Sequence, residues 1–123
     1  MKRILVCGGR DFTDRDLVFA TMDKVKGIFG DFELVHGGAK GADSFSDEWA
    51  DSVGCSKKVF KPDWKMYKRA AGPIRNGQML EYLRRGEEPL VIAFWDGKSK
   101  GTKDMITKAK KAGVKCNTVL YVA

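Results

Sequence analysis

Apolar residues along the chain occur in five short runs, separated by longer amphipathic segments. The runs predict strands over 3–7, 32–36, 58–61, 90–95 and 114–122, of which 3–7 is expected to be buried. Between them, apolar residues recur every three or four positions, which predicts helices over 13–29, 42–53, 73–85 and 102–112. The run at 90–95 is continuously apolar, as is typical of a central strand covered on both faces.

Strand and helix alternate in units of roughly thirty residues, the size of a βαβ unit, and a last strand closes the series. This order predicts an α/β fold of the Rossmann-like type, a three-layer sandwich. We expect a five-stranded parallel sheet in the order 3-2-1-4-5, with helices on both faces and a topological switch between the first and fourth strands. The whole chain, 1–123, is expected to form one domain.

Several residues predict where the helices begin and end. Thr13 followed by Asp16 fits a capping box, and Thr102 is expected to cap the last helix. Pro73 is well suited to the first position of the third helix. Residues 62–72 are expected to form a long loop with room for one helical turn.

The loops on the two edges of the predicted sheet differ in character. Those that follow strands, at 8–11, 37–43, 62–72 and 96–102, are long and carry glycines and charged residues, whereas those that precede strands are short and plain. Ligands of such sheets bind outside the carboxyl ends of the strands, at the switch point. This asymmetry predicts a binding site at that edge.

Three of these loops have the residue types that bind phosphate. Residues 37–43 contain three glycines and lead into a helix, so bare backbone and free N–H groups could face an anion; the alternative is a plain glycine-rich turn. Loops 8–11 and 99–102 repeat the combination of glycine with a charge or a hydroxyl. None fits the Walker or the GxGxxG fingerprint. The predicted ligand residues are Gly8, Gly9, Arg10, Asp11, Gly37, Gly38, Ala39, Gly41, Ala42, Asp43, Arg69, Arg75, Ser99, Gly101 and Thr102.

The charged members of this set have ordinary alternatives. Arg10, Arg69 and Arg75 could clamp an anion or pair with surface carboxylates. Asp11 and Asp43 could accept from ribose hydroxyls or cap helices.

Aromatic residues and one histidine complete the candidate chemistry. Trp64 and Tyr67 could stack on a base, whereas Trp95 is expected in the core. His36, at a strand end, is interpreted as a satisfied buried group and not as a catalyst.

Composition limits the function further. The chain has 123 residues, 43% hydrophobic and 11% aromatic, as in globular proteins. No apolar run has the length of a membrane span and no signal peptide is recognisable, so we expect a cytoplasmic protein without a membrane partner. Three scattered cysteines, no CxxC and a single histidine argue for reduced thiols and against a metal site, and no cofactor is expected.

The formal net charge of +7 is concentrated near the end of the chain. Seven lysines lie between positions 98 and 115, against only Asp96 and Asp104. Such a patch attracts nucleic acids, although a solvated helix face gives the same pattern.

The assembled motifs resemble those of the SLOG superfamily, in its YspA or cpYpsA-related branch. The matching segments are GGRDF at 8–12, HGGAKGAD at 36–43, PDW at 62–64, AGPIRNGQM at 71–79, and the segment from FWD to GT at 94–102. The resemblance implies a Rossmann-like fold, and it adds Asn76 to the expected ligand residues. It also implies a pocket for nucleotides or nucleotide-derived ligands, and a role as a ligand sensor or binder in a phage or a bacterium.

The superfamily also contains enzymes, the cytokinin-activating phosphoribohydrolases, which use a PGGxGTxxE motif. This chain keeps only Gly101 and Thr102 of that motif, and Met105 stands where the glutamate is expected. An N-glycosidase or other nucleotide hydrolase is therefore our alternative, with Asp11, Asp96 or Asp104 as general base. DNA-binding recombination mediators of the superfamily suggest a second alternative, supported by the net charge. The sequence leaves a homo-oligomer open.

Overall fold

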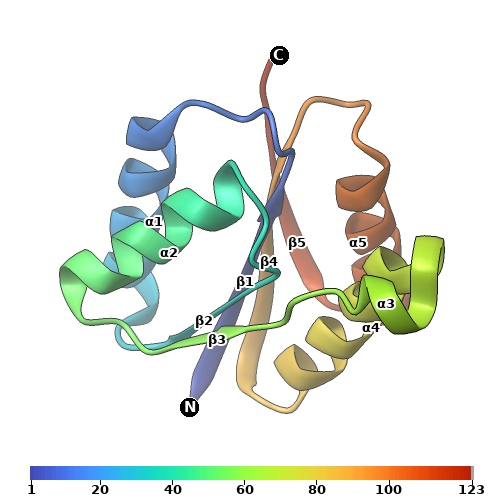
Figure 1. The fold of residues 1–123 in the computed structure, drawn as a ribbon. Coiled ribbons are helices and arrows are strands. Elements are labelled where there is room, and N and C mark those ends of the chain that lie inside the picture. The colour runs from blue at the N-terminus through green and yellow to red at the C-terminus, as the bar shows by residue number, and fades with distance from the viewer. Residues whose placement is uncertain (123) are drawn as a thin grey trace.

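The structure is a computed structural model that describes residues 1–122. Its centre is a parallel five-stranded sheet in the order β3-β2-β1-β4-β5, which confirms the predicted fold class and strand order (Figure 1). The strands are β1 (Lys2–Gly8), β2 (Glu33–His36), β3 (Lys57–Val59), β4 (Glu87–Trp95) and β5 (Lys115–Leu120). Because β1 pairs with both β2 and β4, the crossover direction reverses there.

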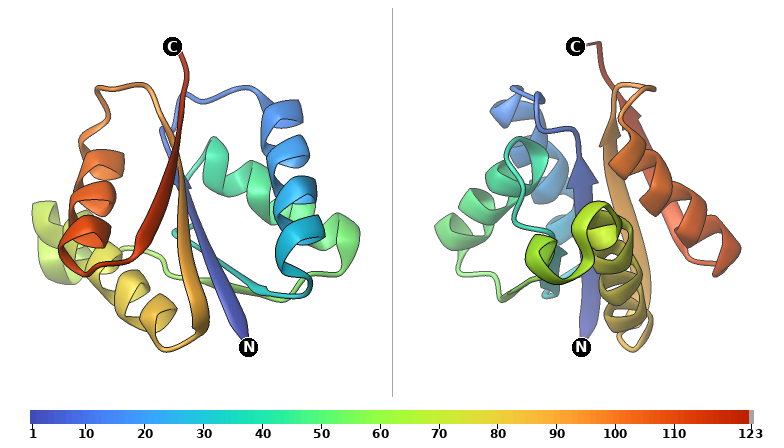
Figure 2. Two further views of the ribbon diagram at one scale, coloured as in Figure 1. Left: turned by 180° about the vertical axis from the view of Figure 1, so that it is seen from behind. Right: turned by 45° about the vertical axis from the view of Figure 1, so that its right-hand side comes forward.

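Helices cover both faces of the sheet (Figure 2). On one face lie α1 (Arg15–Phe29) and α2 (Ala42–Val53), and on the other lie α4 (Ala71–Arg84) and α5 (Lys100–Lys111). Alternation along β1 makes the two cores distinct, since Ile4 and Val6 join the first and Leu5 and Cys7 the second.

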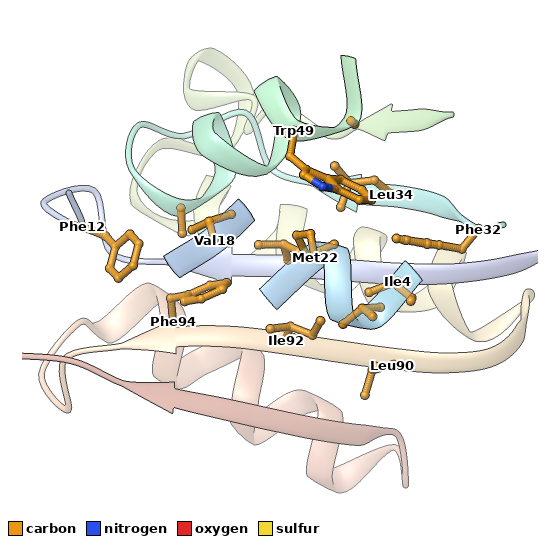
Figure 3. Close-up of a cluster of buried hydrophobic side chains, with 14 residues drawn as sticks. Ile4, Phe12, Val18, Met22, Phe32, Leu34, Trp49, Leu90, Ile92 and Phe94 are labelled. Atoms are coloured by element: carbon orange, nitrogen blue, oxygen red, sulfur yellow. The ribbon is translucent and has the colours of Figure 1, made fainter. Parts of the chain in front are cut away.

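The core under α1 and α2 is rich in aromatic side chains (Figure 3). Trp49 is fully buried and stacks on Phe32 with 5.8 Å between ring centroids, and its indole N–H donates to Asp23 Oδ1. Phe12, in the loop after β1, packs against Phe94 at the end of β4. This contact holds the carboxyl ends of the two central strands together, where the site was predicted.

Two of the predicted helix starts are wrong. The N-cap of α1 is Asp14, whose Oδ1 accepts from the Leu17 N–H, and Thr13 lies outside the helix. The N-cap of α5 is Ser99, so Thr102 lies inside the first turn, buried. Both errors have one cause: several polar residues in succession are each able to cap, and backbone geometry selects among them.

The segment after β3 is more helical than predicted. It contains α3 (Trp64–Tyr67), capped by Asp63, and a 3-10 turn, η1 (Lys68–Ala70), before α4 begins at Ala71. Pro73 is therefore the third residue of α4, still in the first turn, where its missing N–H removes no helical hydrogen bond.

Strand limits also differ from those predicted. β4 begins at Glu87, three residues before the apolar run, because its backbone already pairs with Lys2 of β1 at that point. β3 is shorter and ends at Val59. Within residues 1–122, no helix has the length and apolar character needed to cross a membrane.

Candidate functional site

A cavity of about 860 Å³ opens at the carboxyl ends of the strands. Its walls come from the loops after β1, β2, β3 and β4 and from the first turns of α4 and α5. The volume lies within the usual range for small-molecule sites. The cavity is located at the switch between β1 and β4, as the sequence predicted.

The structure brings most of the predicted residues to this one cavity. Its lining includes Gly8, Gly9, Arg10, Asp11, Gly37, Gly38, Ala39, Asp43, Trp64, Arg75, Asn76, Asp96, Ser99, Gly101 and Thr102. Five predicted residues are not among the lining residues: Gly41, Ala42, Tyr67, Arg69 and Asp104. That the lining residues bind a ligand remains a prediction.

The glycine loop after β2 is closed by its own hydrogen bonds. Asp43 Oδ2 accepts from the N–H groups of Gly37 and Ala39, at 3.1 and 3.2 Å. The Gly38 N–H donates to His36 Nδ1 at 3.0 Å. These three N–H groups are therefore committed within the loop and do not form the open anion cradle that the sequence suggested.

Two glycines of the predicted set allow close packing behind the cavity wall. Gly41 has φ of 80°, and a Cβ on it would lie 2.3 Å from the carbonyl oxygen of Gly9. A Cβ on Gly8 would lie 2.6 Å from the Cβ of Ala42. The start of α2 is thus pressed against the β1 loop, which explains why Gly41 and Ala42 lie behind the lining.

The first turn of α5 offers free donors instead. Asp96 Oδ1 accepts from the N–H groups of Lys98 and Ser99, at 2.8 and 2.7 Å, and the hydrogen bond from Ser99 is the larger cause that lowers the Asp96 pKa. The N–H groups of residues 100–102 donate to no group within residues 1–122. Gly101 lines the cavity, and a Cβ placed on it would meet no atom within 4 Å. The first turn of α5, at the positive end of the helix, therefore lies at the cavity wall.

Arg75 forms its hydrogen bonds within the protein. Its Nη1 donates to the carbonyl oxygens of Gly37 and Phe60, at 2.6 and 3.3 Å, and its Nε donates to Asn76 Oδ1. Burial lowers the pKa of Arg75, and the nearby Asp43 opposes that shift. The predicted anion clamp is thus largely a tie between the loops after β2 and β3.

Asn76 connects this tie to α5. It is buried, and its Nδ2 donates to the carbonyl oxygen of Gly101 and to Asp104 Oδ2, at 3.1 and 3.0 Å. Asp104 also binds Lys108 through both oxygens, at 2.5 and 2.6 Å. Asp104 is therefore a structural carboxylate outside the cavity, which removes one of the three candidate bases.

Asp11 remains as a carboxylate at the cavity rim. Its Oδ1 accepts from the Tyr121 hydroxyl at 3.2 Å. Burial, followed by this hydrogen bond, raises the pKa of Tyr121 to about 12.

His36 is a satisfied buried group, as the sequence predicted. Because Nδ1 accepts from the Gly38 N–H, the ring proton is placed on Nε2, which donates to Asp47 Oδ1 at 2.7 Å. Ser44 lies with His36 and Asp47 around a second cavity of about 500 Å³, a set of residue types known from hydrolase triads. Both ring nitrogens already have partners, so no base is available to a serine.

Some lining residues were missed from the sequence. Lys61 and Pro62 follow β3, Gly72 is the second residue of α4, and Lys98 follows β4; all four lie in segments that follow strands, as the predicted ligand residues do. Cys7 and Met79 belong to the second core and reach the cavity floor, which no local pattern reveals. Burial raises the pKa of the Cys7 thiol.

Comparisons with known proteins agree with this architecture. Residues 2–67 match the family described as "YspA, cpYpsA-related SLOG family". The chain is 33% identical over 120 residues to the Gene 61 protein of Mycobacterium phage D29, covering 93% of each sequence, which fits the expected phage or bacterial source. The solved X-ray structure of TM1055 is similar with a TM-score of 0.70 and 17% identity, over 94% of this chain and 72% of that one, and shows the fold alone.

The family match covers more than half of the chain, and the phage relative is similar over nearly its whole length. The chain therefore belongs to the YspA, cpYpsA-related SLOG family.

Proposed function

We propose that the cavity binds a nucleotide or a nucleotide-derived small molecule, with a phosphate at the first turn of α5. The observation that carries this proposal is the set of free N–H groups at 100–102, in a helical turn whose Gly101 lines the cavity and has open space beside it. Backbone donors at the positive end of a helix stabilise a phosphate. Arg10 and Lys98, both exposed at the cavity rim, add positive charge.

The rest of the cavity suits a sugar and a base. Trp64 is half-exposed and lies on the lining, where its ring can stack on a base. Membership of a SLOG family supports a nucleotide-related ligand over an unrelated anion. We therefore expect sensing or sequestration of a phosphorylated nucleoside.

Gly101→Val tests the phosphate position. The new side chain enters the open space beside Gly101 at the cavity wall, in the same turn as the free N–H groups, while valine is tolerated in a helix at least as well as glycine. We expect affinity for adenosine 5′-monophosphate and for inorganic phosphate to fall at least tenfold, measured by titration calorimetry, with the melting temperature maintained.

Gly27→Val is the matched control. Gly27 is an exposed helical glycine of α1 that is absent from the cavity lining, and a Cβ there also meets no atom within 4 Å. It should keep wild-type affinity. Wild-type affinity in Gly101→Val would contradict the proposed phosphate position.

The hydrolase alternative has a specific observation in its favour. Asp11 lines the cavity, and only one of its oxygens has a recorded partner among residues 1–122, so the other could act on a water molecule. Chromatography of nucleotides after incubation with the protein distinguishes the two functions. Release of base or phosphate that disappears in Asp11→Asn would favour the hydrolase; recovery of intact nucleotide favours binding.

The lysine-rich end of the chain supports the nucleic-acid alternative by charge alone. Lys110, Lys111 and Lys115 are exposed and are not among the cavity's lining residues. Binding of single-stranded DNA with an affinity that falls steeply with salt would support this alternative.

A further inference from the structure

Asp43 presents an unsatisfied hydrogen-bonding atom at the cavity wall. Its side chain is only 4% exposed, and the residue lines the cavity. Oδ2 accepts from two backbone N–H groups, whereas Oδ1 is buried and accepts from no group within residues 1–122. A buried carboxylate oxygen without a partner is rare in native proteins and asks for a missing donor.

The protein's own groups do not supply that donor. Arg75 is close enough to influence Asp43 electrostatically, but its Nη1 and Nε donate to Gly37, Phe60 and Asn76. Both N–H groups next to Asp43 in the loop are already bound to Oδ2. Arg75 therefore contributes a nearby positive charge but no hydrogen bond, and Oδ1 remains able to accept one.

A second part of the cavity lining has the opposite polarity. The N–H groups at 100–102 and the side chains of Arg10 and Lys98 are donors without a recorded acceptor in the described chain. A ligand that satisfies both groups carries an anionic group for the α5 donors and a hydrogen-bond donor for Asp43. A simple anion satisfies only the α5 donors.

We infer that Asp43 selects the ligand by accepting a hydrogen bond, through Oδ1, from a hydroxyl or amino group of a phosphorylated nucleoside. The inference rests on the proposed function and specifies which part of the nucleotide is recognised away from the phosphate. Ribose hydroxyls and base amino groups share this chemistry, and the probes below distinguish them.

Asp43→Asn reverses the polarity at this point. The amide oxygen can keep both loop N–H groups, so the amide NH₂ takes the place of Oδ1 and offers a donor where an acceptor stood. The four probes are inorganic phosphate, ribose 5-phosphate, adenosine 5′-monophosphate and its 2′,3′-dideoxy analogue. We expect phosphate affinity to be unchanged or higher, because a negative charge is removed, and adenosine 5′-monophosphate affinity to fall at least tenfold.

The other two probes identify the donor. A tenfold loss for ribose 5-phosphate but none for the dideoxy nucleotide assigns a ribose hydroxyl, and the reverse assigns the base. Asp51→Asn is the control, since it removes one carboxylate from the same helix, where Asp51 pairs with Lys57 away from the cavity lining. It should leave all four affinities unchanged.

Two results would overturn the inference. One is equal affinity of wild type and Asp43→Asn for all three organic probes, and the other is an equal loss for phosphate, which would indicate a general disturbance of the loop. A wild-type protein that binds none of the four probes would instead refute the proposed function, and this inference with it.

A measurement on the wild type covers the case in which the variant does not fold. The side-chain carboxyl ¹³C resonance of Asp43 should move when adenosine 5′-monophosphate is added and stay in place with phosphate. A resonance that ignores both probes, while calorimetry shows nucleotide binding, contradicts the role of Asp43.

Discussion

The buried carboxyl of Asp43 both stabilises and destabilises the fold. Its carboxyl organises the loop after β2 through two backbone hydrogen bonds, yet the same burial that fixes it raises its pKa above the ordinary value of 3.8. The folded state therefore holds the Asp43 proton more tightly than the unfolded chain does. Ionising this carboxyl at neutral pH reduces the free energy of unfolding.

The raised pKa predicts how the stability of Asp43→Asn depends on pH. The variant should gain stability over the wild type as pH rises from about 3.8 through the raised folded pKa, and the gain should be constant above that window. Urea unfolding of both proteins at pH 3.5, 5 and 7 measures it, and other titrating groups cancel in the difference. A difference that does not change with pH would show that Asp43 has similar pKa values in the folded and unfolded chains.

At the residue level the sequence predicted positions better than roles. Loops that follow strands were enough to collect most of the cavity lining, including Gly8, Asp43 and Gly101. The direction of each hydrogen bond was not predictable, because the N–H groups of the glycine loop turn toward Asp43 and His36 only in the folded backbone. Gly41, predicted as a ligand residue, lies behind the cavity lining, where the lack of a Cβ allows close packing.

Among the elements, α5 depends on α4 for its position. Asn76 is the link, since its Nδ2 donates to the carbonyl oxygen of Gly101 and to Asp104 while its Oδ1 accepts from Arg75. The first turn of α5, where we place the phosphate, is therefore held from the side by a buried amide.

Asn76→Ala should remove the hydrogen bonds that fix the first turn of α5 against α4. The change leaves the Arg75 Nε without its acceptor, so we expect a loss of about 1–3 kcal/mol in the free energy of unfolding. Phosphate affinity should fall as well, because the N–H groups at 100–102 are no longer fixed. Chemical denaturation and calorimetry measure the two effects.

Gln78→Ala is the comparison for this variant. It lies on the same helix and is exposed, and a change there is expected to alter stability by no more than about 0.5 kcal/mol. Unaltered phosphate affinity in Asn76→Ala would mean that the turn keeps its geometry without the amide.

The elements were predictable where burial decided them. The apolar run at 90–95 correctly indicated a central strand. Predictions failed at Thr13 and Thr102, because another residue able to cap, Asp14 or Ser99, lies within three positions of each. The turns of α3 and η1 were only partly foreseen, because a four-residue helix has no periodicity to read.

For the whole molecule, the order of the parallel strands determines where the cavity lies, and the loops determine which charges and hydrogen-bonding groups line it. The order β3-β2-β1-β4-β5 followed from the alternation of strands and helices, and with it the position of the switch. The balance of charges in the cavity did not follow from the net charge of +7, since most of the lysines responsible lie elsewhere.

Hydrogen exchange over the whole chain provides the corresponding prediction. On adding adenosine 5′-monophosphate, protection should increase at the amides of residues 100–102, which have no partner in the described chain. It should change little at 37–39, which are already bonded, and at the opposite edge around 30–31 and 54–56. Protection concentrated at 37–39 would instead restore the glycine loop as the phosphate cradle.

The contact between Gly41 and the Gly9 carbonyl also has a consequence for evolution. Since no larger residue fits at Gly41 without moving α2, and a side chain at Gly8 would strike Ala42, relatives that bind quite different ligands are expected to retain both glycines. These two glycines would then be conserved for the packing of α2 against the loop after β1, and not for contact with a particular ligand. Relatives with different ligands should instead differ at lining residues that this packing does not involve, such as Arg10, Lys61, Trp64 and Lys98.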